Sequence, residues 1–348
     1  MKRSYRRWAA GLLALTLILL TAAAAFNWAV DPCFLYRLPD RWRPVFFNER
    51  YQDAGLARNC PADTALVGTS MVANYRVGQV AAAYGGTAVK LTIPDGYFSE
   101  FDKVLSVLWR HDAPKRIVFS LDINILIRDE SGRTAEMPDY LYDENPLNDL
   151  RYLLNKDTLY YSAYTLLANR RGTASTLDEA FTWDGTVGWS KETALAGYKR
   201  PAAAAETART DLYFANADAN LAILDRWIAD HPDTEFDLFF PPYSILYWDK
   251  MQRQGDLDAT FAAVERVMDD LLRQENVRLY FFASDRDIVT NLNNYCDYIH
   301  HSGKVCSRIL ELLQTDEYRV TPDNAGKLLE DWHKFVADYD YDSIWTTG

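Results

Sequence analysis

Five short apolar runs, rich in β-branched and aromatic residues, recur along the 348-residue chain and alternate with longer segments of helical periodicity. Strands that are apolar at nearly every position are typical of a parallel sheet covered on both faces, with helices as the crossovers. The pattern therefore predicts an α/β domain of three α/β/α layers, doubly wound and flavodoxin-like, around a five-stranded parallel sheet. The predicted strands are residues 64–68, 87–92, 116–121, 235–240 and 277–282.

Helical spacing of apolar residues predicts helices between and after these strands. A long insertion, residues 128–215, separates the third and fourth strands, and we expect two helices within residues 145–171 and then a looser part with Trp183 and Trp189. Long insertions after sheet strands often form lids or substrate walls, although plain packing explains this one equally well. The other predicted helices are residues 98–111, 216–231, 257–274 and 323–342.

The N-terminus carries an apolar segment, residues 8–30, after a short basic segment, residues 1–7. A run of about 20 apolar residues can cross a bilayer as a helix, and basic residues before it favour a cytoplasmic N-terminus. The alternative is a cleavable signal peptide, since the small residues at 21–25 suit a signal peptidase. Both interpretations export the rest of the chain, which is then either tethered to the cell membrane by a single pass or secreted.

The exported part divides into an irregular collar, residues 31–60, and the α/β domain, residues 61–348. The formal net charge is −12, and no basic stripe follows residue 10, so a nucleic-acid partner is not expected. Four cysteines allow local disulfides between Cys33 and Cys60 and between Cys296 and Cys306, or four free thiols.

A candidate nucleophile lies in the stretch TALVGTSMVAN, residues 64–74, where Ser70 follows the first predicted strand. Ser70 is either a nucleophile at a strand-to-helix turn or only the cap of the next helix. A hydrolytic serine needs a nearby base and an acid that orients the base. His300 and Asp297 follow the fifth strand at a three-residue spacing that puts both on one face of a turn. Carboxyl ends of parallel strands share one rim, so we expect Ser70 and His300 to meet there.

Other residues are candidates for the same rim. The block FFPPYS closes the fourth strand, and its prolines favour an extended exit that presents Tyr243 or Ser244 as a substrate wall, although packing explains the block equally well. His301 is a further wall candidate, or the true base in place of His300. A metal site of Asp297, His300 and His301 lacks a further ligand at a familiar spacing, so no metal or other cofactor is expected.

A GxS turn after the first strand and a late Asp-x-x-His together resemble the SGNH (GDSL-type) hydrolase superfamily, over roughly residues 60–315 apart from the insertion. The resemblance implies Ser70 as nucleophile, His300 as base and Asp297 as the orienting acid. It also implies an oxyanion hole formed by the amide of Ser70, the amide of Gly96 after the second strand, and the side chain of Asn124 after the third.

The sequence departs from this family at two places. Thr69 replaces the usual Asp of the GDS triplet, and the block after the third strand lacks a Gly-x-Asn-Asp. Asp122 is the other candidate in that block, but an ionised carboxylate is a poor oxyanion donor. With these departures the sequence resembles the divergent exported branch of the superfamily. That branch includes the membrane-anchored protein of teichoic-acid D-alanylation and the alginate O-acetyltransferases.

The resemblance implies an exported O-acyl esterase or acyltransferase that acts on a cell-envelope glycan or glycopolymer through an acyl-enzyme. Transfer would depend on a separate membrane acyl-exporting protein as partner. The alternative is a catalytically inactive SGNH fold that binds glycans or assists envelope assembly, which the Tyr- and Trp-rich insertion suits.

Overall fold

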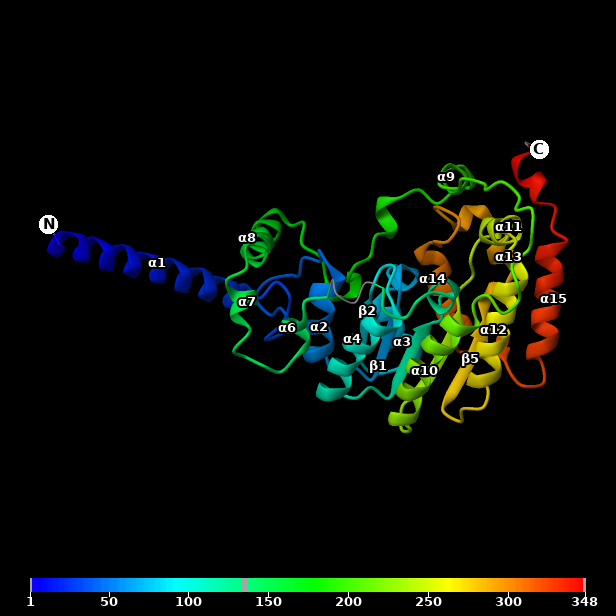
Figure 1. Cartoon of the computed structure of the whole chain (residues 1–348), viewed down its shortest axis with the longest axis horizontal. Helices are drawn as coiled ribbons and strands as arrows, with labels where there is room; N and C mark the ends of the chain where they lie inside the picture. The colour runs from blue at the N-terminus through cyan, green and yellow to red at the C-terminus, as the bar shows by residue number, and fades with distance from the viewer. Residues whose placement is uncertain (1, 133–136, 347–348) are drawn as a thin grey trace.

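The computed structural model describes residues 2–132 and 137–346, and shows a long N-terminal helix that leaves an α/β domain at one end (Figure 1). The strands are β1 (Thr64–Gly68), β2 (Ala88–Thr92), β3 (Arg116–Ser120), β4 (Glu235–Phe240), β5 (Val277–Phe281) and β6 (Arg319–Val320). The longer helices are α1 (Lys2–Val30), α2 (Glu49–Asn59), α3 (Val77–Tyr84), α4 (Phe98–His111), α8 (Lys156–Arg171), α10 (Phe214–Asp230), α11 (Ile245–Gln254), α12 (Leu257–Leu271), α14 (Gly303–Leu312) and α15 (Ala325–Ala337). Short helices are α5 (Ile123–Leu126), α6 (Asp139–Tyr142), α7 (Leu150–Leu153), α9 (Lys191–Ala196) and α13 (Arg286–Val289).

The sheet has the order β2-β1-β3-β4-β5-β6. The first five strands pair in parallel, which confirms the predicted parallel α/β sheet, and their residues are almost all buried. The predicted count of five was one too low. The sixth strand pairs antiparallel with β5 through only two residues, too few to produce an apolar run in the sequence.

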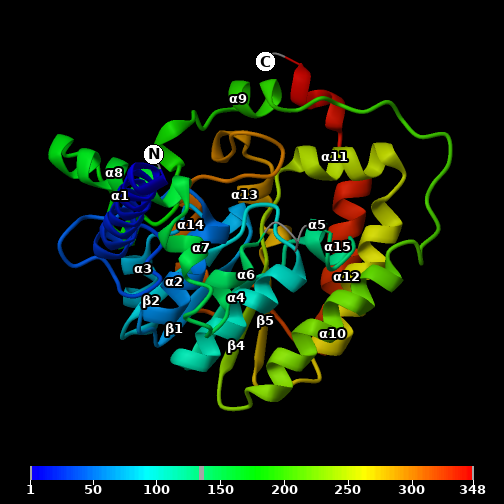
Figure 2. The same cartoon turned by 60° about the vertical axis from the view of Figure 1, so that its left-hand side comes forward.

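The strand order reverses after β2, and this reversal places the helices in two layers. Right-handed crossovers then put α3 on one face of the sheet and α4, α10 and α12 on the other. On the second face α2, α4, α10 and α12 pack side by side, and on the first α3 packs against α14 (Figures 1 and 2). The crevice where ligands bind in such sheets lies beyond the carboxyl ends of β1 and β3, where the order reverses.

The predicted helices of the domain are confirmed as α4, α10, α12 and α15, and the two helices expected within residues 145–171 are α7 and α8. Local sequence explains where α8 begins and ends. The side chain of Asn155 accepts a hydrogen bond from the amide of Asp157 at its start, and Gly172 ends it in the left-handed conformation, at φ 71°.

The collar was predicted to be irregular throughout, and this is wrong for its second half, which forms α2. The helix was missed because its buried face includes the polar residues Gln52 and Asp53, so no apolar stripe marks it. Gln52 holds the irregular part in place, since its side-chain amide donates to the carbonyls of Pro32 and Val45. Arg50 pairs with the buried Glu100 at 2.6 Å and joins α2 to α4.

Gly55 in α2 provides a test of this packing. A Cβ at position 55 would lie 2.1 Å from the carbonyl oxygen of Cys33 and 2.6 Å from the carbonyl carbon of Phe34. Helix propensity alone predicts that Gly→Ala stabilises by up to about 1 kcal/mol. We expect Gly55→Ala instead to lower the free energy of unfolding by about 1–3 kcal/mol, because the backbone of the collar must move.

Urea denaturation of both variants measures this effect. The matched control is Gly326→Ala in α15, where an added Cβ meets nothing within 4 Å, and this variant should be neutral or slightly stabilised. Equal stability of the two variants would show that the collar backbone is not in close steric contact with α2 at Gly55.

The predicted local disulfides are absent, because all four cysteines are free thiols. Cys33 lies buried beside Tyr152, whose hydroxyl accepts a hydrogen bond from its amide, whereas Cys60 contacts the carbonyl oxygen of Ala88 on β2. Cys306 contacts His301, with 3.6 Å between its Sγ and the imidazole Nδ1. The other possibility considered from the sequence, four free thiols, is the observed one.

Candidate active site

Ser70 lies at the end of the fully buried strand β1, where the chain enters the short 3-10 helix Ser70–Val72. The residue that caps this helix is Thr69, whose hydroxyl accepts a hydrogen bond from the amide of Met71. Capping therefore does not use the Ser70 hydroxyl. Instead, Ser70 Oγ lies 2.8 Å from Nε2 of His300, across a separation of 230 residues in the chain.

His300 and Asp297 lie in the loop that follows β5 and α13. Nδ1 of His300 lies 2.7 Å from Oδ2 of Asp297, and Oδ1 of Asp297 accepts hydrogen bonds of 2.7 Å from the amides of Ile299 and His300. The loop is closed by a bridge between Tyr295 and His301. The three residues predicted from the sequence are thus brought into a hydrogen-bonded chain, serine to histidine to carboxylate.

The charge on Asp297 fits the orienting position. Burial acts to raise the pKa of its carboxyl, but the hydrogen bonds and charge of His300 and the amide of Ile299 outweigh it and hold that pKa below the ordinary value. An ionised carboxylate at Nδ1 fixes the tautomer whose Nε2 lone pair faces Ser70. The arrangement can therefore accept the hydroxyl proton of Ser70 and stabilise the imidazolium that results.

Thr69 and Asp122 connect the ends of β1 and β3 at the point where the strand order reverses. The Thr69 hydroxyl donates to Oδ2 of Asp122 at 2.6 Å, and the carbonyl of Thr69 accepts a bond from the hydroxyl of Thr92 at the end of β2. Burial raises the pKa of Asp122, although the bond from Thr69 and the charge of His300 oppose this. Thr69, which stands where the GDS triplet has Asp, thus fixes the backbone beside Ser70.

Part of the insertion lies over the site, and the sequence did not identify which residues would. The ring of Trp183 meets His300 edge-on at 5.4 Å between centroids and stacks with Trp189 at 5.5 Å. Figure 2 shows the segment that carries α9 passing above the loop after α13. The amide of Trp183 donates to the side chain of the buried Asn74, four residues after Ser70.

Lys90 connects the segment that carries Trp183 to the turn after Ser70. This lysine of β2 is buried, and its ammonium donates to the carbonyls of Ala73 and Tyr75 and to the hydroxyl of Thr182. Burial lowers the pKa of Lys90 to about 7. A single side chain thus ties the turn after Ser70 to the residue before Trp183. A lysine inside a predicted strand was the one signal that could have revealed this contact.

The predicted oxyanion donors are only partly available. Ser70 begins a helix, where the first amides have no intrahelical acceptor. The amide of Gly96, however, already donates to the carbonyl of Ile93 at 2.8 Å within the loop after β2, so this prediction is wrong. Asn124 lies half-buried in α5, and it is Asp122, not Asn124, that bonds to the turn that carries Ser70.

Tyr243 and Ser244 were predicted to line a substrate wall, but both side chains are completely buried. Tyr243 packs on Tyr247, and Ser244 precedes α11. The Ser244 hydroxyl donates to the carbonyl of Tyr298 at 2.8 Å, and Tyr295 donates to the carbonyl of Pro242. The block FFPPYS therefore anchors the loop that holds His300 and does not form a wall.

His301 is likewise neither a wall residue nor the base, because it is buried and its Nδ1 faces Cys306. Burial lowers its pKa from 6.5 to about 4. The unfolded chain therefore binds a proton on His301 near pH 6.5, and the folded chain only near pH 4. Between these values acid favours unfolding.

We expect the His301 contribution to the free energy of unfolding to fall by about 3 kcal/mol between pH 6.5 and pH 4. Urea denaturation of the wild type and of His301→Gln at several pH values isolates the His301 contribution. The carboxylates titrate in both proteins, so their effect cancels in the difference. The stability difference between the two proteins should shrink or change sign as the pH falls. A difference that stays constant with pH would contradict a neutral, buried His301.

A metal does not fit the site as built. Ligand atoms of Cys296, Asp297 and His300 lie within 4.8 Å of one another. Burial raises the pKa of the Cys296 thiol to about 12, which opposes the thiolate a metal requires, and Asp297 and His300 already bond to each other. His301, the third ligand considered from the sequence, faces Cys306 instead.

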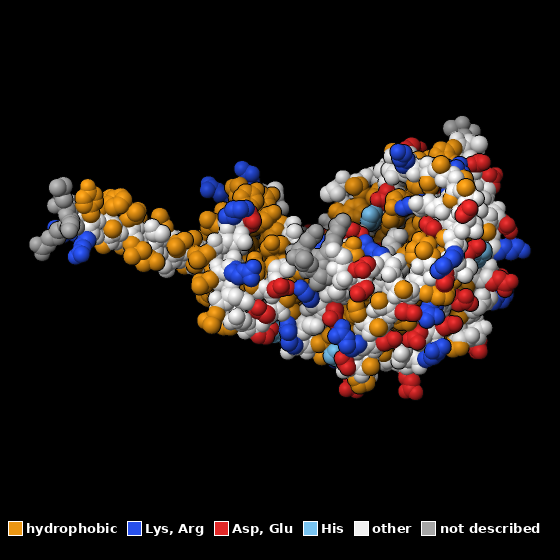
Figure 3. Space-filling model, viewed as in Figure 1, with side chains coloured by type: hydrophobic (Ala, Val, Ile, Leu, Met, Phe, Trp, Pro, Cys, Tyr) orange, Lys and Arg blue, Asp and Glu red, His pale blue; other side chains and the backbone are white. Residues whose placement is uncertain are grey.

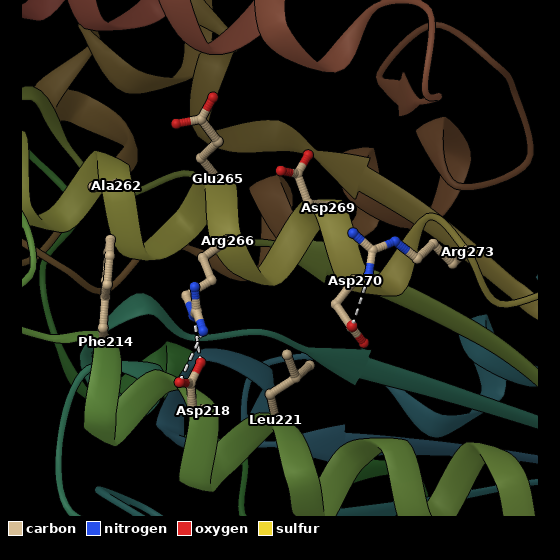
Figure 4. A pocket seen from close by; sticks show the side chains of 9 residues that line it. All are labelled: Phe214, Asp218, Leu221, Ala262, Glu265, Arg266, Asp269, Asp270 and Arg273. Atoms are coloured by element: carbon tan, nitrogen blue, oxygen red, sulfur yellow. Dashed lines mark hydrogen bonds and ion pairs between the residues drawn. The ribbon is translucent and has the colours of Figure 1, made fainter.

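A separate surface hollow lies between α10 and α12 (Figure 4). An ion pair between Arg266 and Asp218 spans the two helices, and the acidic residues Glu265, Asp269 and Asp270 also line the hollow. None of Ser70, Asp297 or His300 lines it. It is therefore distinct from the triad.

Comparisons with known proteins do not assign this chain to a family. No protein-family profile matches the chain, and no curated protein matches it. Among solved structures the chain is similar to a protein provisionally described as a platelet activating factor from Streptococcus pneumonia, with a TM-score of 0.40 and 11% identity over 82% of this chain and 91% of that chain. A likeness of this size supports no statement about family or activity.

Proposed function

We propose that the protein is a serine-dependent O-acyl esterase or acyltransferase of the SGNH type. The observation that carries the proposal is the continuous hydrogen-bonded chain of Ser70, His300 and Asp297, with distances of 2.8 and 2.7 Å. All three residues are partly exposed to solvent.

The mechanism follows from these contacts. Ser70 Oγ attacks the acyl carbon while its proton passes to Nε2 of His300, and Asp297 stabilises the imidazolium. His300 then returns the proton to the leaving alkoxide, and an ester of Ser70 remains. Water or a sugar hydroxyl, deprotonated by His300, then attacks this ester. As the bond between the acyl group and Ser70 Oγ breaks, His300 returns the proton to Ser70 Oγ, and free acid or an acylated sugar is released. Transfer would depend on a membrane protein that supplies the acyl group.

The proposed substrate is an acylated cell-envelope glycan. The stacked pair Trp183 and Trp189 next to His300 offers flat apolar faces of the kind that pack against sugar rings. The apolar helix α1 is long enough to cross a membrane, which suits a tethered enzyme that meets the envelope. Retention of α1 as an anchor, and exposure of the domain outside the cytoplasm, are part of the proposal.

Acylation of Ser70 tests the proposal. The full chain in detergent is incubated with p-nitrophenyl acetate, quenched in acid and mapped by peptide mass, and we expect one acetyl group on Ser70. Addition of an acceptor glycan should then yield acetylated sugar for a transferase, or only acetate for an esterase. Absence of any Ser70 ester in a folded sample would contradict both activities.

A second candidate function is a catalytically inactive fold that binds glycans or assists envelope assembly. One observation favours it: the Gly96 amide, expected in the oxyanion hole, is used by the carbonyl of Ile93. The close contact of Ser70 with His300 favours the active form. The acylation experiment separates the two, because a binding protein retains glycan affinity without forming an ester on Ser70.

A further inference from the structure

The helix α8 turns its apolar side chains outward. Its large exposed side chains are Leu159, Tyr160, Tyr164 and Leu167, whereas the residues it buries are the small or polar Thr158, Ser162, Thr165 and Ala168. A helix on a water-exposed surface normally shows the reverse arrangement. The surface continues over α7 and the loop before it. We call the α7–α8 face the surface formed by Leu147, Leu150, Leu154, Leu159, Tyr160, Tyr164 and Leu167.

This concentration of exposed apolar residues is unusual for the molecule. Outside α1, eleven large hydrophobic side chains are exposed among the described residues, and seven of them belong to the α7–α8 face. A concentration of exposed apolar side chains of this kind marks contact with a partner or a membrane.

The α7–α8 face is fixed to the last turn of α1. The side-chain amide of Asn27 donates to the carbonyl of Leu153 at 2.8 Å, and Ser162 donates to Oδ1 of Asn27 at 2.9 Å. One turn further, Tyr152 donates to the carboxylate of Asp31 at 2.9 Å. Both views show α8 beside the point where α1 leaves the domain (Figures 1 and 2).

The length of α1 places this junction at a definite depth. Residues 8–26 hold only apolar residues, Gly and Thr, and as a helix they span about 28 Å, close to the roughly 30 Å of a hydrocarbon core. Asn27 is the first strongly polar residue after this run, and Trp28, exposed, follows it as in the aromatic belt of a membrane interface. Because Asn27 contacts both α7 and α8, a membrane crossed by residues 8–26 would have its headgroups at the level of the α7–α8 face.

The charges around the face suit the same surroundings. Arg151, Arg170 and Arg171 are exposed in α7 and at the end of α8, in a protein with a net charge of −12, whereas the exposed Lys156 pairs with Asp157. Figure 3 shows orange side chains together with blue ones at the base of α1, where α8 lies. A helix with Leu and Tyr on one side and Lys or Arg beside them is typical of helices that lie in the interface of anionic membranes.

We propose that the α7–α8 face docks on the outer leaflet of the membrane that α1 crosses, with its Leu and Tyr side chains at the boundary between headgroups and acyl chains. The domain is then held at two places, which fixes its orientation, whereas α1 alone would leave it free to tilt. The proposal requires α1 to remain attached and does not depend on the triad.

The test uses the full chain, one copy per nanodisc of phosphatidylcholine and phosphatidylglycerol. An environment-sensitive fluorophore is attached at Tyr160→Cys and at Leu167→Cys, with the unsubstituted chain as the background for its own four cysteines. Leu212→Cys is the matched control, since Leu212 is 49% exposed and Leu167 is 40% exposed, and Leu212 lies outside the face. Leu19→Cys in α1 reports insertion of the helix.

We expect nitroxide-labelled lipids to quench the labels at 160, 167 and 19, and to leave the label at 212 unchanged. Blue-shifted emission at 160 and 167 should accompany the quenching. The proposal is overturned if the label at 19 is quenched while those at 160 and 167 behave like the label at 212. A blue shift without lipid quenching would also overturn it, because protein would then cover the face.

Discussion

Ser70→Ala is expected to reduce kcat/KM for ester cleavage by about 10⁴-fold or more while the fold is unchanged. The hydroxyl lost is the one 2.8 Å from Nε2 of His300. Because Thr69, not Ser70, caps the following 3-10 helix, the substitution should leave the free energy of unfolding within about 0.5 kcal/mol of the wild type.

Steady-state hydrolysis of p-nitrophenyl acetate, together with urea denaturation, measures both parts of this prediction. Ser343→Ala, at an exposed serine near the C-terminus, is the control and should retain full activity. Loss of stability by about 1 kcal/mol with little loss of activity would show that Ser70 is a structural cap after all.

Asp297→Asn is expected to reduce kcat/KM by about 10³- to 10⁴-fold, by changing which nitrogen of His300 carries the proton. The asparagine carbonyl can take over the two amide hydrogen bonds that Oδ1 accepts from Ile299 and His300. Its NH₂ group then faces Nδ1 of His300, which must accept rather than donate. The proton moves to Nε2, so the imidazole can no longer accept the proton of Ser70.

The same ester assay measures the loss, and the circular dichroism spectrum confirms that the loop still folds. Asp316→Asn removes an exposed carboxylate that pairs with Arg319 at 3.1 Å, and it serves as the matched control. Activity of Asp297→Asn within about threefold of the wild type would mean that the carboxylate does not orient the base.

The features predicted correctly from the sequence are those with a local pattern. Five strands were identified because each is buried on both faces and therefore reads as a continuous apolar run. The spacing of Asp297 and His300 likewise predicts their contact, since three residues of a turn bring the two side chains together. The contact between His300 and Ser70 was predicted because the carboxyl ends of parallel strands lie on one rim of the sheet.

The features that were missed depend on contacts between distant segments. Nothing near Trp183 shows that its ring meets His300, because that contact is set by Lys90, Asn74 and the path of the insertion. The incorrect prediction for Gly96 comes from a local contact rather than a distant one. Its amide is used by a turn of its own loop, and an assignment by position along the family pattern does not reveal that bond.

The activation of Ser70 by His300 can be measured without knowing the substrate. The full chain in detergent is treated with a fluorophosphonate, and the intact mass is recorded beside that of Ser70→Ala. We expect one adduct per wild-type chain and none on the variant. A folded wild type that forms no adduct, or a variant that forms the adduct equally fast, would contradict this expectation.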